Sequence, residues 1–302
     1  MNTPDSTLRG RVFDISRACV HDGPGLRTVV YLKGCRLDCP WCHNPEGKSF
    51  EQEFSFDRQQ CIAANISRNA CSVECPLRDT AGGSGMENIS GRVADACPPK
   101  AIKTVGRDYT AGELAGEVTE DEAFFRQTRG GVTFSGGEPM AQHEFLLSCA
   151  ALLGQRHIHR VLETSGFWSG SLVKDVAQNL DMVLFDLKHV DSDKYKTYTG
   201  ADNRQVLQNL EHLLRSDIDV ELVLTLIPGF NDSELDIMSI ADYLRTLSRK
   251  PLVRLLPFHR LAVSKERLFG RAYPYAGNPA LPANLLPDTA RLFQDCGIDV
   301  RV

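Results

Sequence analysis

The stretch DGPGLRTVVYLKGCRLDCPWCHNPEG, residues 22–47, decides the fold, because an apolar run leads directly into three closely spaced cysteines. The β-branched and apolar residues at 28–34 are typical of a buried strand. Cys35, Cys39 and Cys42 follow, with three and then two residues between them. One short loop can therefore bring three thiolates around a single small inorganic group.

On spacing alone, this loop is compatible with a zinc site, with an iron site, or with three thiols that only pack in the core. Structural zinc prefers a closed set of four protein ligands. The fourth would have to be His43, which is poorly placed to reach the same ion because it directly follows Cys42. Three thiolates on a four-iron cube instead leave one iron without a protein ligand. That iron can bind a cofactor directly, as redox cleavage of the cofactor requires.

Five further apolar runs are typical of strands, and the segments between the later ones have helical spacing. The strand candidates are 131–137, 159–166, 181–189, 220–229 and 252–259, and the helix candidates are 144–155, 206–215 and 235–247. Alternation of strands and helices predicts an α/β fold with a parallel sheet and right-handed crossovers.

Polar side chains follow most of these runs, and a barrel of parallel strands carries its chemistry where the strands end. The residues are Ser135 to Glu138, Glu163, Thr164, Ser165, Asp186, Lys188, His189 and His259. We expect them to share one rim with the cysteine loop, although each taken alone is equally compatible with ordinary loop polarity.

A second cysteine group lies in residues 51–106, where the strand and helix rhythm is replaced by Cys, Pro, Gly, Asn and Ser. Its members are Cys61, Cys71, Cys75 and Cys97. We expect an inserted module here, between residues 1–50 and 107–302 of the main domain. Four thiolates suffice for one closed iron-sulfur cluster, while zinc and a metal-free module stay open.

Composition excludes several classes of protein. With 302 residues, 42% of them hydrophobic, the chain is long enough for one large α/β domain. A net charge of -5 lacks the basic excess of a nucleic-acid-binding surface. Neither a signal peptide nor an apolar run of membrane-spanning length is present, so we expect a cytoplasmic protein with no membrane or nucleic-acid partner. In that compartment ten cysteines are better explained as ligands or buried thiols than as disulfides.

Residues 22–47 resemble the cluster loop of the radical SAM superfamily, named for S-adenosylmethionine (SAM). The DGPG and CHNPE elements narrow the resemblance to the activating enzymes of glycyl radical enzymes. The similarity continues through SGGEP at 135–139, ETSG at 163–166, DLKHVDS at 186–192 and PFH at 257–259.

The resemblance implies a partial (β/α)6 TIM-like radical SAM barrel with a [4Fe-4S] cluster on Cys35, Cys39 and Cys42. Such an enzyme cleaves SAM reductively to a 5'-deoxyadenosyl radical, which takes a hydrogen atom from a backbone glycine of a partner glycyl radical enzyme. It further implies a flavodoxin as reductant, and we expect a monomer.

The resemblance also assigns the cofactor-binding residues. Glu138 would meet the ammonium of SAM, Lys188 its carboxylate, Asp191 and Ser192 its adenosine, and His259 its adenine end. The full implied set is Trp41, Cys42, His43, Gly136, Gly137, Glu138, Glu163, Ser165, Asp186, Lys188, Val190, Asp191, Ser192 and His259. The glycines would let the backbone approach the amino-acid end of SAM.

Many members of the family carry a ferredoxin-like insertion with eight cysteines and two clusters after this loop. Here only four cysteines occur, and Asn65 and Ser67 stand where closely spaced ligands would be expected. The sequence therefore predicts at most one additional [4Fe-4S] cluster. The competing functions are a radical SAM enzyme acting on a small molecule and a non-catalytic iron-sulfur or zinc protein.

Overall fold

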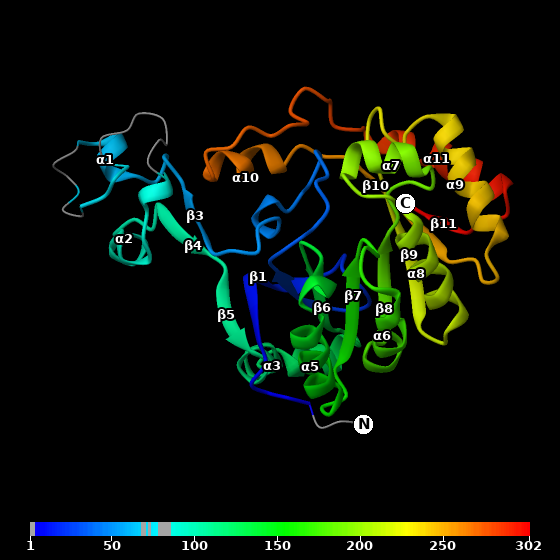
Figure 1. The fold of residues 1–302 in the computed structure, drawn as a ribbon, viewed down its shortest axis with the longest axis horizontal. Coiled ribbons are helices and arrows are strands. Elements are labelled where there is room, and N and C mark those ends of the chain that lie inside the picture. Colours follow the sequence, from blue (N-terminus) through cyan, green and yellow to red (C-terminus); the bar gives the residue numbers. More distant parts are fainter. Residues whose placement is uncertain (1–3, 68–70, 72–73, 78–85) are drawn as a thin grey trace.

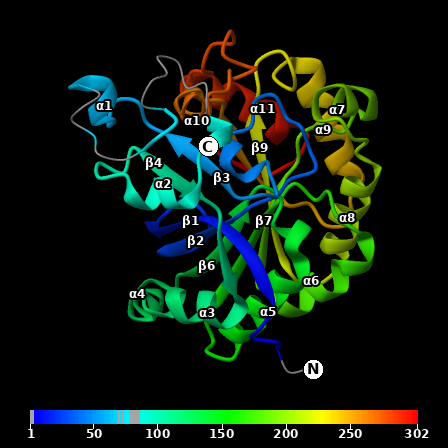
Figure 2. The ribbon, with the colours of Figure 1, turned by 60° about the vertical axis from the view of Figure 1, so that its left-hand side comes forward.

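The computed structural model describes residues 4–67, 71, 74–77 and 86–302. Six neighbouring strands form the parallel centre of its main sheet, and they coincide with the six predicted runs. They are β2 (Arg27–Leu32), β6 (Gly131–Gly136), β7 (His159–Thr164), β8 (Met182–Asp186), β9 (Asp219–Leu226) and β10 (Leu252–Pro257). The predicted partial barrel is confirmed (Figures 1 and 2).

Three outer strands, which the sequence pattern did not reveal, extend this centre. They are β1 (Arg9–Cys19), β5 (Arg107–Thr110) and β11 (Val300–Arg301). The full order is β11-β10-β9-β8-β7-β6-β2-β1-β5, in which β1 runs antiparallel to both β2 and β5. Because β11 and β5 stand at opposite ends of this order, the sheet curves without closing.

Helices cover the outside of the sheet, and their apolar faces supply the core. In α8, for example, Val206, Leu210 and Leu213 recur at helical spacing and are fully buried. The helices are α3 (Ala111–Thr119), α4 (Glu122–Thr128), α5 (His143–Gly154), α6 (Val173–Asn179), α7 (Ser192–Thr199), α8 (Arg204–Arg215), α9 (Glu234–Thr246), α10 (Ala262–Leu268) and α11 (Leu286–Asp295). Within the described ranges, no helix is long and apolar enough to cross a membrane.

The described elements between Glu53 and Val105 form a small unit at the side of the barrel (Figures 1 and 2). Strands β3 (Glu53–Phe56) and β4 (Ile102–Val105) pair as an antiparallel ribbon and are accompanied by α1 (Ile62–Asn65) and α2 (Gly91–Ala96). The unit has an apolar cluster of its own, to which Phe56 and Ile102 belong.

A buried lysine joins this unit to the barrel. Lys33, fully buried just after β2, donates from Nζ to Glu53 Oε2 of β3 and to the carbonyl of Glu46, at 2.7 Å each. A buried ammonium is tolerated when it is paired and hydrogen-bonded in this way. Because Glu46 follows the cysteine loop, the same contact ties the inserted segment to the site.

Candidate active site

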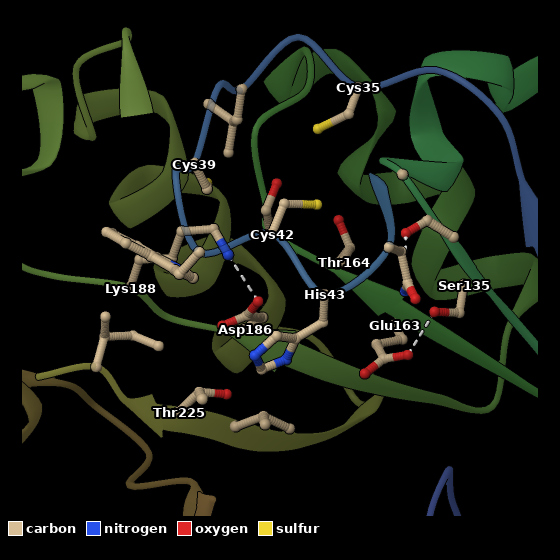
Figure 3. A pocket seen from close by; sticks show the side chains of 18 of the residues that line it. Cys35, Cys39, Cys42, His43, Ser135, Glu163, Thr164, Asp186, Lys188 and Thr225 are labelled. Atoms are coloured by element: carbon tan, nitrogen blue, oxygen red, sulfur yellow. Dashed lines mark hydrogen bonds and ion pairs between the residues drawn. The ribbon is translucent and has the colours of Figure 1, made fainter. Parts of the chain in front are cut away.

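A cavity of about 210 Å³ lies at the carboxyl ends of the parallel strands. Its walls come from the cysteine loop and from the ends of β6, β7, β8, β9 and β10, as a barrel rim requires. Figure 3 shows the labelled side chains around it. The lining includes Cys35, Cys39, Trp41, Cys42, His43, Ser135, Gly136, Gly137, Glu163, Thr164, Ser165, Asp186 and Lys188. These sequence-predicted residues are therefore brought together.

The three cysteines surround one space, into which the sulfur atoms of Cys35 and Cys42 point in Figure 3. Backbone hydrogen bonds hold their loop, from Gly34 N to Gly47 O at 2.7 Å and from Asp38 N to Thr199 O at 2.8 Å. All three thiols are free. A preorganised loop of three soft sulfur donors suits an iron-sulfur cluster that keeps one iron open.

Burial disfavours thiolates at this site unless a positive group compensates them. It raises the pKa of Cys35 to about 11 and that of Cys39 to about 12, and it raises the pKa of Cys42 as well. The ammonium of Lys188 lowers the pKa of all three thiols against this effect. A bound metal cluster would complete the compensation, because metals bind the deprotonated thiol.

Gly137 lets three backbone segments meet at the cavity wall. Its N–H donates to Leu32 O at 2.9 Å, and the next N–H, of Glu138, donates to Gly34 O at 2.8 Å. A Cβ on Gly137 would lie 2.3 Å from Gly47 O and 2.5 Å from Gly34 O. Only glycine fits where the segment after β6 crosses both ends of the cysteine loop.

Glu138 does not line the cavity but lies behind its wall, fully buried. It accepts hydrogen bonds from Thr164 Oγ1 at 2.7 Å, Ser165 N at 2.9 Å and Ser165 Oγ at 2.6 Å, and a further one from Met140 N at 3.2 Å. Burial raises its pKa, while these donors lower it. The carboxylate therefore ties the end of β6 to the end of β7.

Glu163 is the carboxyl group of β7 that does line the cavity. Ser135 Oγ donates to its Oε2 at 2.5 Å, a contact drawn in Figure 3. Burial raises the pKa of Glu163, Ser135 lowers it, and the charges of Asp22 and Asp186 raise it further. A cationic ligand group in the cavity would stabilise its charged form.

Asp186 and Lys188 form an ion pair at the end of β8, with Nζ 2.7 Å from Oδ2. Burial opposes the charge of Lys188, yet Asp186 and Cys39 raise its pKa well above the usual range. Asn231, which the sequence analysis missed, fixes this strand end: its Nδ2 donates to Lys188 O at 3.1 Å and to Thr225 O at 3.0 Å. The lysine is thus a permanent, positioned cation facing three thiols.

The segment after Lys188 turns away from the cavity, so Val190, Asp191 and Ser192 do not line it. Asp191 caps α7 by accepting from Lys194 N at 2.8 Å, and its own N–H donates to His189 Nδ1 at 2.9 Å. His189 Nδ1 is therefore an acceptor, and Nε2 donates to Asp236 Oδ1 at 3.0 Å. The predicted contacts of these three residues with adenosine stay predictions.

The aromatic rings of Trp41, His43 and Phe230 form the remaining wall, whereas His259 does not line the cavity. His43 stacks on His259 with ring centroids 4.0 Å apart, and Trp41 packs on Phe230 at 4.3 Å. Burial and, to a smaller extent, the nearby His259 lower the pKa of His43 to about 4, so the ring is neutral at physiological pH. Its Nε2 is buried without a hydrogen-bond partner among the described residues. A polar atom left unpaired in this way is suited to a ligand.

Several cavity residues had not been singled out from the sequence. They are Leu37, Asn44, Lys48, Val223, Thr225, Ile227, Phe230, Asn231 and Leu256. Asn44 stands two positions after Cys42, Thr225 lies on β9 and Asn231 in the loop after β9, and a polar residue is common at each of these places. Position alone could have pointed to Asn44, which lies within CHNPE.

The second cysteine group also comes together. Cys61, Cys71, Cys75 and Cys97 line one small apolar hollow together with Phe56 and Ile102. Burial raises the pKa of Cys75, and the charges of the other three cysteines raise it further. Four thiols scattered over 37 positions of the chain thus share one place.

Comparison with known proteins gives concordant results. Residues 29–240 match the Radical SAM superfamily. The chain is 34% identical to the 4-hydroxyphenylacetate decarboxylase activating enzyme of Clostridioides difficile, over 96% of this chain and 95% of that protein. It is 35% identical to the isethionate sulfite-lyase activating enzyme of Oleidesulfovibrio alaskensis, over 89% and 90%. A radical SAM methyltransferase from Sphaerobacter thermophilus shares the fold, with a TM-score of 0.54, 14% identity, and coverage of 96% and 76%.

Proposed function

The chain belongs to the radical SAM superfamily and, within it, to the activating enzymes of glycyl radical enzymes, and from that premise we propose that Cys35, Cys39 and Cys42 hold its [4Fe-4S] cluster. Enzymes of this family use SAM and install a radical on a partner protein. The observation that supports the ligand set is that all three thiols of one loop line the cavity where the strand ends converge.

Held by Cys35, Cys39 and Cys42, the reduced cluster would supply the single electron with which SAM is cleaved at its S–C5' bond to methionine and a 5'-deoxyadenosyl radical. The radical takes a hydrogen atom from a backbone glycine of the partner glycyl radical enzyme, leaving 5'-deoxyadenosine and a glycyl radical. The chain's task is to position SAM and to exclude other hydrogen donors. The enclosing rings of Trp41, Phe230 and His43 support this task.

We assign the polar groups of SAM from the lining of the cavity. Lys188 binds the carboxylate, and Glu163, with its raised pKa in the absence of a cation, meets the ammonium. Gly136 and Gly137 admit the amino-acid end, and the unpaired Nε2 of His43 with its neighbour His259 contacts the adenosine end. Glu138 acts as a positioning residue, because its oxygens already accept four hydrogen bonds.

We further propose that residues 51–106 form a separate ferredoxin-like module in which Cys61, Cys71, Cys75 and Cys97 hold one additional [4Fe-4S] cluster. Their shared hollow supports it. Replacing all four by alanine should lower the iron content of the reconstituted protein from about eight to about four atoms. Zinc without sulfide, or an unchanged iron content, would contradict the assignment.

The partner is a glycyl radical enzyme, and several kinds of glycyl radical enzyme, which act on different substrates, are candidates. The relatives that activate 4-hydroxyphenylacetate decarboxylase, isethionate sulfite-lyase and choline trimethylamine-lyase are 34%, 35% and 34% identical to the chain, so identity does not separate them. A flavodoxin as electron donor, a monomeric state and a cytoplasmic location stay predictions.

The test of the activity combines the reduced protein, SAM and each of three purified glycyl radical enzymes of these kinds. A glycyl radical signal in electron paramagnetic resonance (EPR), together with 5'-deoxyadenosine, is expected with one of them. Loss of both in Cys35→Ala, but not in Cys149→Ala, would tie the activity to the loop, because Cys149 is a fully buried thiol of α5 outside the cavity. SAM cleavage in the absence of all three loop cysteines would contradict the proposal.

A further inference from the structure

Lys33 contacts both ends of the cysteine loop. Its backbone N–H donates to Arg11 O of β1 at 2.9 Å, and its carbonyl accepts from Gln142 Nε2 at 2.8 Å, so the sheet fixes the residue from which the loop starts. Its side chain is 0% exposed and reaches the end of the loop, where Nζ donates to Glu46 O at 2.7 Å. One buried ammonium thus joins the two ends of the loop that carries the three cysteines.

The inserted unit encloses this ammonium from both of its own ends. At the start of the unit, Glu53 Oε2 of β3 lies 2.7 Å from Lys33 Nζ. At its end, Gly106 has a φ of +107° and lies against the stem of the lysine, since a Cβ there would be 2.6 Å from Lys33 Cδ. Gln52 Nε2 donates to the carbonyl of Gly106 at 2.8 Å and so links the two ends.

Glu53 is the counter-ion of Lys33. Among the residues that the structure describes, it is the one carboxylate in an ion pair with this lysine. It also lies 3.5 Å from Arg271 Nη1, but Arg271 has a second partner in Glu266 at 3.0 Å. A buried ammonium without a counter-ion is strongly unfavourable, so loss of the Glu53 charge would draw Lys33 Nζ toward water and away from Glu46 O.

We propose that Glu53 is a positioning residue for the cysteine loop and that it acts through Lys33. By neutralising the buried ammonium, it keeps Nζ on Glu46 O and the two ends of the loop together. The inserted unit then serves the main site in a way that needs none of its own four cysteines. The importance of this role for catalysis rests on the proposed function of the loop as the ligand of the cluster.

The first experiment is hydrogen exchange of the metal-free full chain, followed by mass spectrometry, in the wild type, Glu53→Gln and Lys33→Met. The loop ends report through Gly34 N, which donates to Gly47 O at 2.7 Å, and through Cys35 N, which donates to Lys48 O at 3.1 Å. Exchange of the peptide 33–48 should be about tenfold faster in both variants, because the loop opens locally more often. Peptides from β7 and β8 should exchange as in the wild type.

Glu51→Gln is the matched control, because Glu51 is also a carboxylate at the start of the inserted unit and also pairs with a cation of the barrel. Its side chain is 86% exposed, and its partner Arg11 keeps Asp108 at 2.6 Å. Exposed ion pairs contribute little, so exchange of the loop should equal that of the wild type. Equal exchange in Glu53→Gln and Glu51→Gln, or faster exchange throughout the barrel in Glu53→Gln, would overturn the inference.

The double variant Lys33→Met/Glu53→Gln tests whether Glu53 acts through Lys33. Its loop should exchange no faster than that of Lys33→Met, because the charge of Glu53 has no buried ammonium left to neutralise. Effects that add up in the double variant would show that Glu53 acts by another route and would contradict the proposal.

The second experiment uses the reconstituted enzyme. The rate of 5'-deoxyadenosine formation per loop cluster, counted from the EPR signal of the reduced cluster, should be about tenfold lower or less in Glu53→Gln and unchanged in Glu51→Gln, since displaced ligands misplace the reacting groups. A wild-type rate in Glu53→Gln despite a faster-exchanging loop would remove Glu53 from the positioning residues. A wild-type protein that shows the expected exchange but binds no iron at the loop would refute the proposed ligation instead.

Discussion

Replacing Gly137 by alanine should lower both stability and activity, because this residue lies where the two ends of the cysteine loop meet the segment that follows β6. The added Cβ would lie 2.3 Å from Gly47 O and 2.5 Å from Gly34 O. Ordinary contacts begin at about 3.4 Å, so the overlap is roughly 1 Å on each side.

Both obstructing atoms belong to the backbone, so no side chain can rotate away. The loop ends must move by about 1 Å, which strains the hydrogen bonds from Gly34 N to Gly47 O and from Glu138 N to Gly34 O. Overpacking of this kind costs about 1–3 kcal/mol of unfolding free energy. A 1 Å misplacement of reacting groups costs about 100-fold in rate.

Urea unfolding of the metal-free chain and the rate of 5'-deoxyadenosine formation by the reconstituted enzyme measure the two effects. Gly116→Ala is the matched control, since a Cβ there meets nothing within 4 Å and Gly116 lies inside α3. That variant should be as active as the wild type and stabilised by about 0.5–1 kcal/mol. If Gly137→Ala equals Gly116→Ala in both measurements, the steric reasoning is refuted.

Three other substitutions test separate parts of the site. Cys39→Ala should abolish iron binding at the loop and SAM cleavage, whereas Cys149→Ala should retain both in iron analysis and product assays; equal iron loss in both would contradict the ligand assignment. Lys188→Met should weaken SAM binding in equilibrium dialysis by about 10-fold or more at unchanged iron content, because one charge-assisted hydrogen bond is lost, and unchanged affinity would remove Lys188 from the site. Asp236→Asn should lower the unfolding free energy by about 1–3 kcal/mol at pH 7. Burial opposes the charge of Asp236, but hydrogen bonds from Lys194, Ser233 and His189 lower its pKa from 3.8 to about 2. The stability that the charged carboxylate contributes is therefore present above pH 3.8 and lost as the pH falls toward 2. A difference in unfolding free energy that persists undiminished at pH 2 would show another cause.

Some predicted site residues line the cavity, where we propose that SAM binds, and others hold the cavity wall in place. Glu138 illustrates the second kind: a carboxylate in a motif at a strand end is expected to face a ligand, yet four donors of the chain occupy it behind the wall. Asn231 has a similar role for Lys188 through two backbone carbonyls. Substitutions at such positions should affect the geometry of the site before they affect its charge.

Local pattern determined most of the fold. The six parallel strands and the three helices predicted from apolar periodicity are all present. A buried strand or an amphipathic helix can be predicted locally, because its apolar residues recur at a fixed spacing within a short segment. The spacing of Cys35, Cys39 and Cys42 predicted that one loop brings three thiols to one place, because thiols within eight residues are neighbours whatever the rest of the chain does.

Features that depend on contacts between residues far apart in the chain were decided by the tertiary structure alone. β1, β5 and β11 lie at the two ends of the sheet order, outside the six parallel strands, and their partial exposure leaves no clear period. The departure of Val190, Asp191 and Ser192 from the cavity follows from the capping of α7 and the His189–Asp236 contact, 47 positions apart. The pairing of Lys33 with Glu53 could be recognised only after folding, because the burial of a lysine and the choice of its counter-ion are properties of the surroundings and not of the residue.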